Sequence, residues 1–277
     1  LYGFSSASSA GFSSASVIVP IVVGVVALVA FVKRQRTLDE PLLRLDTLRV
    51  PAFRTAAILV TLINASAAAT NVILPIYLQT SLGVSALETG MVMLPAAAVG
   101  IVLSPISGVV FDKHGARGIG IAGLVLLAGS LCVLGFVNVS TPLVLVAVFC
   151  ALQASGQALA NMPINTWGVN SLPNDLIAHG NALANTGRQV AGAMTTALFT
   201  TVMTSVTAGA LVSGAATAQA TAQGAGAAYL ACAAVAAVAL VVCVAKVRGK
   251  AGQAATEGAS EDAPAVSRKG RLATNEK

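Results

Sequence analysis

The sequence predicts an all-α integral membrane protein with seven transmembrane helices, and three observations support this fold class. Hydrophobic residues make up 56% of the 277 residues and charged residues only 9%, with a mean hydropathy of +0.84, whereas a soluble domain carries about 25% charged residues. Long stretches such as 89–111 and 118–137 contain no charge at all. About 20 apolar residues in a helix are enough to cross a hydrocarbon core of about 30 Å. The basic residues gather at the ends of these stretches.

We expect the helices in chain order at 15–32, 55–78, 89–111, 118–137, 142–162, 181–206 and 227–245, with bends at Pro75, Pro95 and Pro105. Residues 1–14 are small and polar and are expected to form an outer loop. In the linker 33–54, leucines alternate with charged residues, which predicts an amphipathic segment on the membrane surface. Residues 163–179 are expected to be irregular, 207–226 a chargeless loop, and 246–277 a disordered tail.

The distribution of basic residues predicts the orientation. Fifteen of the 16 lysines and arginines fall in the linker 33–54, in the turn after residue 111, or from residue 246 onward. Basic residues are enriched in cytoplasmic segments of membrane proteins. We therefore expect these segments in the cytoplasm and the first residues outside the cell membrane, which requires an odd number of spans and agrees with seven.

Amide side chains inside the spans are the candidates for lining a polar pathway. Asn64, Ala67, Ala68 and Asn71 recur at spacings of three and four, so they share one face of the second helix. That face is expected to point into the protein, because an amide in lipid lacks partners. The fifth span adds two glutamines, Gln153 and Gln157.

A short charged segment, GVVFDKHGAR at 108–117, connects the third and fourth spans. A carboxylate at the start of a helix is stabilised by the helix dipole. Asp112 is therefore expected to hold the helix that begins near Gly118, with Arg117 pairing with it or with a lipid phosphate. Such an arrangement could lock two helices together or release them.

This segment resembles the loop signature of the major facilitator superfamily of transporters. Gly108, Asp112, Gly115 and Arg117 match the signature, and Lys113 stands where arginine is more common. The resemblance implies a cytoplasmic loop that latches neighbouring helices during alternating access. A simpler interpretation is a charged stop at the membrane border.

A second segment, GNALANTGRQVAGA at 180–193, resembles the penultimate helix of the fourteen-helix drug and proton antiporters within that superfamily. The matching residues are Gly180, Asn185, Arg188, Gln189 and Gly192, while Ala191 and Thr195 stand where glycine is common. The resemblance implies that residues 55–245 are the C-terminal six-helix bundle and that 15–32 belongs to a central linker pair. It also implies that the first half of the transporter is missing from this chain, which begins at Leu1 without a methionine.

The function implied by this resemblance is secondary active transport: export of small amphipathic drugs or toxic compounds across the cell membrane, coupled to protons. Arg188 lies about two turns into its expected span, where a charge must face protein, snorkel or pair. Two roles remain open for it, structural tethering and a role in gating or the substrate pathway. Asn185 and Gln189 share a face, whereas Gln189 is expected to point away from Arg188.

No acidic residue lies deep in a span. Proton-driven carriers use an embedded carboxylate whose pKa burial can raise, so we expect the titrating group in the missing half. Glu88, at the outer mouth of the third span, is either that kind of group or simply a solvated helix end.

Other function classes lack the residues that they need. The four cysteines have no metal-ligand or disulfide spacing, and His114 and His179 lie in loops. We therefore expect no enzymatic activity, no cofactor and no metal. The placement of the basic residues at helix ends argues against nucleic-acid binding. A seven-span receptor or a non-transporting scaffold would share the topology, but either would leave both signatures unexplained.

Overall fold

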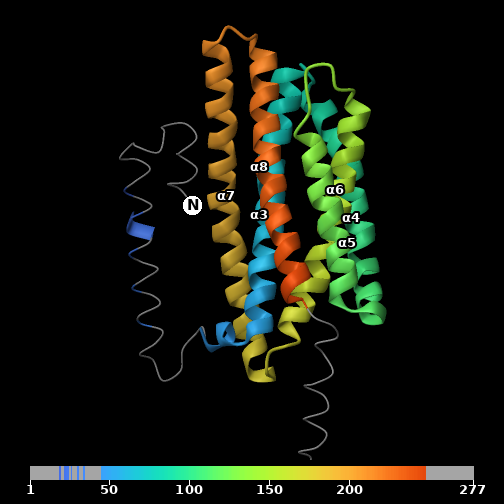
Figure 1. Ribbon diagram of the computed structural model, residues 1–277, viewed down its shortest axis with the longest axis vertical. Coiled ribbons are helices and arrows are strands. Elements are labelled where there is room, and N and C mark those ends of the chain that lie inside the picture. The colour runs from blue at the N-terminus through green and yellow to red at the C-terminus, as the bar shows by residue number, and fades with distance from the viewer. Residues whose placement is uncertain are drawn as a thin grey trace, which may run out of the picture.

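The computed structural model describes residues 45–247, together with residues 19, 22–24, 26, 30 and 34, which are helical. Its elements are η1 (Leu45–Arg49), α3 (Pro51–Ser81), α4 (Ala86–His114), α5 (Ala116–Leu134), α6 (Leu143–Val169), η2 (Asn174–Leu176), α7 (Ile177–Val212) and α8 (Thr217–Lys246). All of these elements are helical, as Figure 1 shows. The expected loop 1–14, most of the span 15–32 and nearly all of the tail 246–277 lie outside the described residues.

Within the described residues, six helices, α3 to α8, are long and apolar enough to cross a membrane by length and composition. Their surface carries large apolar side chains, most clearly on α4, where Leu87, Leu94 and Ile101 are 77%, 63% and 75% exposed. Water-soluble proteins rarely expose apolar patches of this extent. The chain is therefore a multi-pass membrane protein, and the all-α prediction is confirmed for the described part of the chain.

Each of the helices α3 to α8 except α5 is longer than the sequence predicted. α6 continues through Pro163 to Val169, and α7 begins at Ile177, so most of the segment expected to be irregular is helical. Proline is tolerated in membrane helices because neighbouring helices satisfy the freed backbone groups. The expected loop 207–226 shrinks to residues 213–216, since α7 runs to Val212 and the alanine-rich α8 starts at Thr217.

The linker ends in ordered structure against the bundle. In η1, Thr47 is buried, whereas Asp46 and Arg49 are exposed and form an ion pair of 3.3 Å. α3 then starts at Pro51, within the range expected for the linker. Proline suits a first helical position because its fixed φ matches the helix and no hydrogen bond is lost there.

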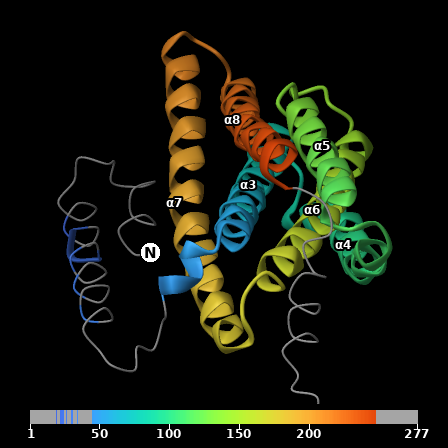
Figure 2. The same ribbon diagram turned by 60° about the horizontal axis from the view of Figure 1, so that its bottom comes forward.

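The helices pack in a repeating pattern. α3 lies against α7 as α6 lies against α4, and α3 lies against α8 as α6 lies against α5. The helices α3, α4 and α5 therefore make the same kinds of contact as α6, α7 and α8, respectively. The exception is that α7 packs closely on α8, while α4 barely touches α5. Figure 2 shows α3 in the middle of the bundle, with α7 on one side and the group of α4, α5 and α6 on the other.

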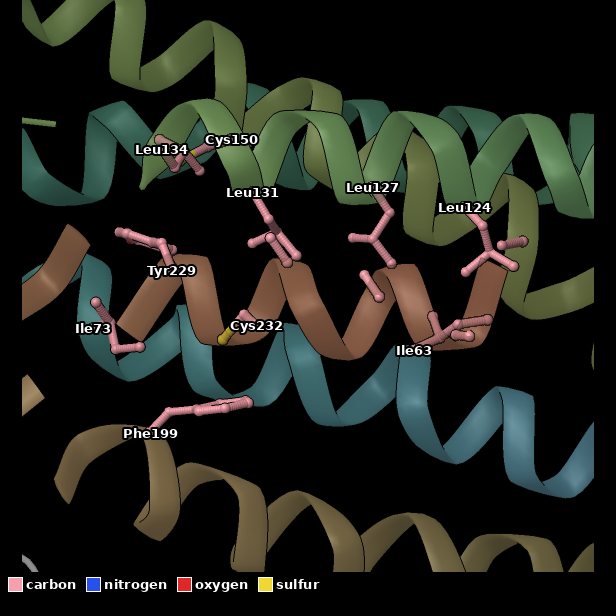
Figure 3. Packing of buried hydrophobic residues seen from close by; sticks show 14 of the residues in the cluster. Ile63, Ile73, Leu124, Leu127, Leu131, Leu134, Cys150, Phe199, Tyr229 and Cys232 are labelled. Atoms are coloured by element: carbon pink, nitrogen blue, oxygen red, sulfur yellow. The ribbon is translucent and has the colours of Figure 1, made fainter. Parts of the chain in front are cut away.

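The hydrophobic core lies between α3, α5, α6 and α8. Leu124, Leu127 and Leu131 recur every three or four residues on α5 and are fully buried. Figure 3 shows them pointing at α8, where Tyr229 lies on the side facing α5 and Cys232 on the side facing α3. This spacing places one continuous apolar stripe of α5 on its neighbours.

Two glycines bring the backbones of α5 and α6 into contact. A Cβ added at Gly123 would lie 2.7 Å from the Ala160 nitrogen, and one added at Gly156 would lie 2.5 Å from the Leu127 nitrogen. Small residues at such crossings allow the close packing on which helix association in lipid depends. Gly129, on the same helix α5, faces open space instead.

This contrast generates a prediction for stability. Gly123→Ala should lower the thermal unfolding midpoint of the detergent-solubilised protein, because the backbone of α6 cannot yield without moving the helix. Overpacking of this kind costs about 1–3 kcal/mol. Gly129→Ala should leave the midpoint unchanged or raise it slightly, since alanine is the better helix former. Equal midpoints for the two variants would contradict the close contact.

Candidate functional site: a polar cavity between α3, α6 and α7

The charged segment 108–117 is mostly helix rather than loop. Asp112 and Lys113 lie exposed in the last turn of α4, and α5 starts at Ala116. The only residue between the two helices is Gly115, with φ 77°, whose N–H donates to the Phe111 carbonyl at 2.7 Å. With ψ 175° this backbone conformation is essentially restricted to glycine, which explains how one residue can reverse the chain.

The expectation that Asp112 holds the start of the next helix is wrong. α5 has Gly115 as its N-cap and no side-chain cap, because a cap must directly precede the first helical residue and Asp112 lies four positions before Ala116. In the described part of the chain, no ion pair joins Asp112 to Arg117. Both charges also sit at helix ends that disfavour them, an anion at a C-terminus and a cation at an N-terminus.

Gly108 lies where α4 approaches α6. A Cβ added there would be 3.2 Å from the Met162 methyl carbon, so the glycine permits a close contact with a flexible side chain.

A polar cavity of about 340 Å³ lies between α3, α6 and α7. It is lined by nine residues from these three helices: Asn64, Ala67, Ala68, Asn71, Gln157, Asn185, Arg188, Gln189 and Gly192. The cavity thus brings together three of the four predicted lining residues with four of the five residues of the second signature.

The cavity forms because two helices carry matching stripes. On α3 the lining residues lie at 64, 67, 68 and 71, and on α7 at 185, 188, 189 and 192, which is the same spacing of three, one and three. This spacing places each set on one helix face. The small residues bring the stripes together, since a Cβ added at Gly192 would be 3.8 Å from that of Ala68.

Arg188 is the only charged residue among the described residues that line the cavity. One terminal nitrogen of its guanidinium donates to the Asn185 side-chain oxygen. It lies about three turns after Ile177, where α7 starts, rather than about two turns into the helix. Its charge is therefore further from the helix end than the sequence indicated, and it faces a cavity wall made of amides.

The amides around Arg188 are only partly engaged. Asn64 donates from its side-chain nitrogen to the Val60 carbonyl at 2.7 Å. For Asn71, Gln157 and Gln189, no hydrogen bond is recorded within the described part of the chain. The cavity therefore offers both donors and acceptors to a small molecule.

The structure places Gln153 and Gly180 outside this cavity. Gln153 is buried, and its side-chain nitrogen donates to the Thr70 hydroxyl at 3.2 Å, which ties α6 to α3. Gly180 is also buried, and an added Cβ would lie 2.4 Å from a methyl carbon of Leu172. Both residues have structural roles in packing.

Gln189 lines the same cavity as Arg188, although the sequence analysis expected it to point elsewhere. Successive helical residues differ by about 100° in direction, and the open wall of α7 is wide enough to include both. What sequence reasoning missed was the pairing of α3 with α7, which lie more than 100 residues apart. The equal spacing of polar and small residues in the two segments was the available signal.

Glu88 acts as a helix cap. Its side-chain oxygen accepts hydrogen bonds from the Ser85 N–H at 3.0 Å and the Ser85 hydroxyl at 2.8 Å, and its own N–H donates to that hydroxyl. This reciprocal arrangement is a capping box at the start of α4. The solvated helix end is therefore the better interpretation of Glu88.

A second cavity, of about 360 Å³, lies around the turn between α5 and α6. Its walls are mainly apolar, and its polar residue Asn138 already accepts hydrogen bonds from Ser140 and Thr141. It offers fewer free polar groups than the cavity around Arg188.

The sequence matches one family model and several known membrane transporters. A family model described as Major Facilitator Superfamily matches residues 3–196. The uncharacterized MFS-type transporter YcnB of Bacillus subtilis is 41% identical over 207 residues, which cover 74% of this chain and 43% of that protein. The lincomycin resistance protein LmrB of Listeria monocytogenes is 37% identical over 205 residues, covering 74% and 44%. A multidrug resistance protein B homolog of Mycobacterium tuberculosis is 27% identical over 209 residues, covering 74% and 38%. The chain spans less than half the length of these relatives.

The geometry predicts which side chains water reaches. In a background carrying Cys132→Ser, Asn71→Cys and Gln189→Cys should react with a small hydrophilic thiol reagent applied to membranes. Gln153→Cys should react at least about tenfold more slowly, because its position is buried between helices. The measurement is the rate of labelling by mass spectrometry, and equal rates at positions 153 and 189 would contradict the cavity assignment.

Proposed function

The chain belongs to the Major Facilitator Superfamily, and on this premise we propose that it forms the C-terminal half of a transporter that exports small drugs or toxic compounds in exchange for protons. The observation that carries the proposal is the cavity between α3, α6 and α7, where polar residues from three membrane helices converge. Amides and an arginine inside a membrane protein are costly unless they face protein or an aqueous path.

The division of the chain follows from this proposal. Residues 55–245 would form the six-helix bundle, 15–32 a helix of the central linker pair, 1–14 an outer loop, and 33–54 and 246–277 cytoplasmic segments. The Gly115 turn would face the cytoplasm of the cell, together with most of the basic residues. The partner of this bundle would be a first half of similar size, in keeping with relatives more than twice as long as the matched region.

The names of the relatives support drugs as the substrate class, since they include lincomycin resistance and multidrug resistance proteins. Proton coupling needs a titratable group in the pathway. None of the residues that line the described cavity is acidic, so we assign the coupling carboxylate to the part of the transporter that this chain does not contain.

The test is transport by the full-length protein that carries these residues. Inside-out membrane vesicles should accumulate radiolabelled lincomycin when a pH gradient, acid inside, is imposed, and should lose it when the gradient is collapsed. Vesicles without the protein provide the control. If neither lincomycin nor any compound of a broad drug panel responds to the gradient, the export function is wrong.

We further propose that Asp112 and Arg117 form part of a cytoplasmic gate. Both are exposed and unpaired with each other in this structure, so a partner for them would have to come from another conformation or from the first half. Lys113, Gly108 and Gly115 would set the position of this turn. In this proposal the charges stabilise one state of the transport cycle and not the other.

Asp112→Asn should slow transport about 5- to 30-fold at equal protein amount in the membrane, because losing about 1–2 kcal/mol from one state shifts a two-state equilibrium by that factor. Asp46→Asn is the matched control. It removes an exposed ion pair with Arg49, and exposed pairs contribute little, so its rate should equal that of the wild type. A wild-type rate for Asp112→Asn as well would leave the segment as a determinant of topology alone.

A further inference from the structure

The walls of the α3–α6–α7 cavity have a specific chemical bias. The described lining residues comprise five carboxamides, one guanidinium and three small residues, with no carboxylate and no aromatic ring among them. The aromatic side chains nearest the bundle centre, such as Tyr77, Tyr229 and Phe199, are buried in the hydrophobic core instead. The cavity therefore lacks both kinds of group that usually recognise a flat organic cation.

Arg188 leaves most of its hydrogen-bonding capacity unused. A guanidinium carries five N–H donors and no acceptor, and the bond recorded for Arg188 engages one terminal nitrogen with Asn185. No acidic side chain pairs with it in the described part of the chain. A cation held about three turns along a membrane helix gains most from an oxygen acceptor that enters the cavity.

The amides complete the complementarity to such an acceptor. Gln189 is adjacent to Arg188 on α7, and Gln157 and Asn71 approach from α6 and α3. Each can donate from its nitrogen toward a second oxygen, and each can accept from a hydroxyl or amide of the ligand. Among the described residues that line this cavity there is no carboxylate to compensate the positive charge of Arg188, so a bound cation would be disfavoured by Coulomb repulsion.

From this geometry we infer that the cavity selects anionic or neutral oxygen-rich compounds, with a carboxylate or carbonyl oxygen bound to Arg188, and disfavours permanently charged aromatic cations. The inference rests on the proposed export function, for which it names the substrate class. It narrows the class of small amphipathic drugs or toxic compounds that the family resemblance suggested. Arg188 is then a binding residue rather than a structural tether.

The experiment measures binding to the purified full-length protein by isothermal titration. The probes are nalidixate, which carries a carboxylate, and ethidium, a permanent aromatic cation. The wild type should bind nalidixate more tightly than ethidium. Arg188→Gln should weaken nalidixate binding at least about tenfold, since hydrogen bonds to charged groups contribute about 1.5–3 kcal/mol. Arg188→Lys should retain part of it, because the charge remains without the planar fork.

Charge reversal and a neighbouring control sharpen the result. Arg188→Glu should abolish nalidixate binding and tighten ethidium binding several-fold. Thr186→Ala should leave both affinities unchanged, because Thr186 is exposed on α7, outside the cavity lining, and its hydroxyl bonds to the Ala182 carbonyl. The circular dichroism spectrum of each variant confirms folding.

Three results would overturn the inference: no nalidixate binding by the wild type, ethidium bound as tightly as nalidixate, or Arg188→Gln binding nalidixate within twofold of the wild type. These outcomes are distinct from failure of the export function. Gradient-driven accumulation of any drug in vesicles would still support export, even if the binding measurements showed that Arg188 does not bind the ligand. Conversely, Arg188-dependent binding without any gradient-driven transport would preserve the site and refute export.

Discussion

The close contact between the backbones of α5 and α6 sets the geometry of the bundle. Lipid provides no hydrophobic force between helices, so association depends on van der Waals packing at short range. Gly123 and Gly156 allow this close approach, because a Cβ at either position would clash with the backbone of the facing helix. Once these helices are fixed, the leucine stripe of α5 faces α8, and α3 is held in the centre by α6, α7 and α8. The cavity occupies the space that this arrangement leaves between α3, α6 and α7.

Polar side chains inside the bundle divide into two groups with different tasks. Some connect segments of the bundle: Gln153 of α6 donates to Thr70 of α3, and Tyr77 of α3 donates at 2.9 Å to the carbonyl of Asn138 in the turn between α5 and α6. Others, such as Gln157 and Gln189, line the cavity and form no such hydrogen bond with another described residue. Gln153 and Gln157 are one helical turn apart on α6, yet only the second faces the cavity. The same residue type thus stabilises the fold at one position and supplies a candidate binding group at the next.

The turn between α4 and α5 shows how strongly one backbone conformation can affect the placement of charge. With Gly115 as the whole connection, Asp112 and Arg117 fall at the facing ends of two helices, each against the local helix dipole. Exposure to water makes this arrangement tolerable, since surface charges interact weakly. If another segment covered this turn, the electrostatic energy of Asp112 and Arg117 would change, whereas the packing of the hydrophobic core would not.

The sequence by itself determined the helical membrane fold, since charge-free stretches of about 20 residues have no other stable form in lipid. It also determined which residues share a helix face, because the helical period fixes that locally: Asn64 with Asn71, and Asn185 with Gln189. The tertiary structure alone decided that these two faces meet and that Gln153 is withdrawn into a helix contact. It also decided that Asp112 ends one helix instead of starting the next. These outcomes depend on packing between segments far apart in the chain and on the conformation of one glycine, neither of which local periodicity records.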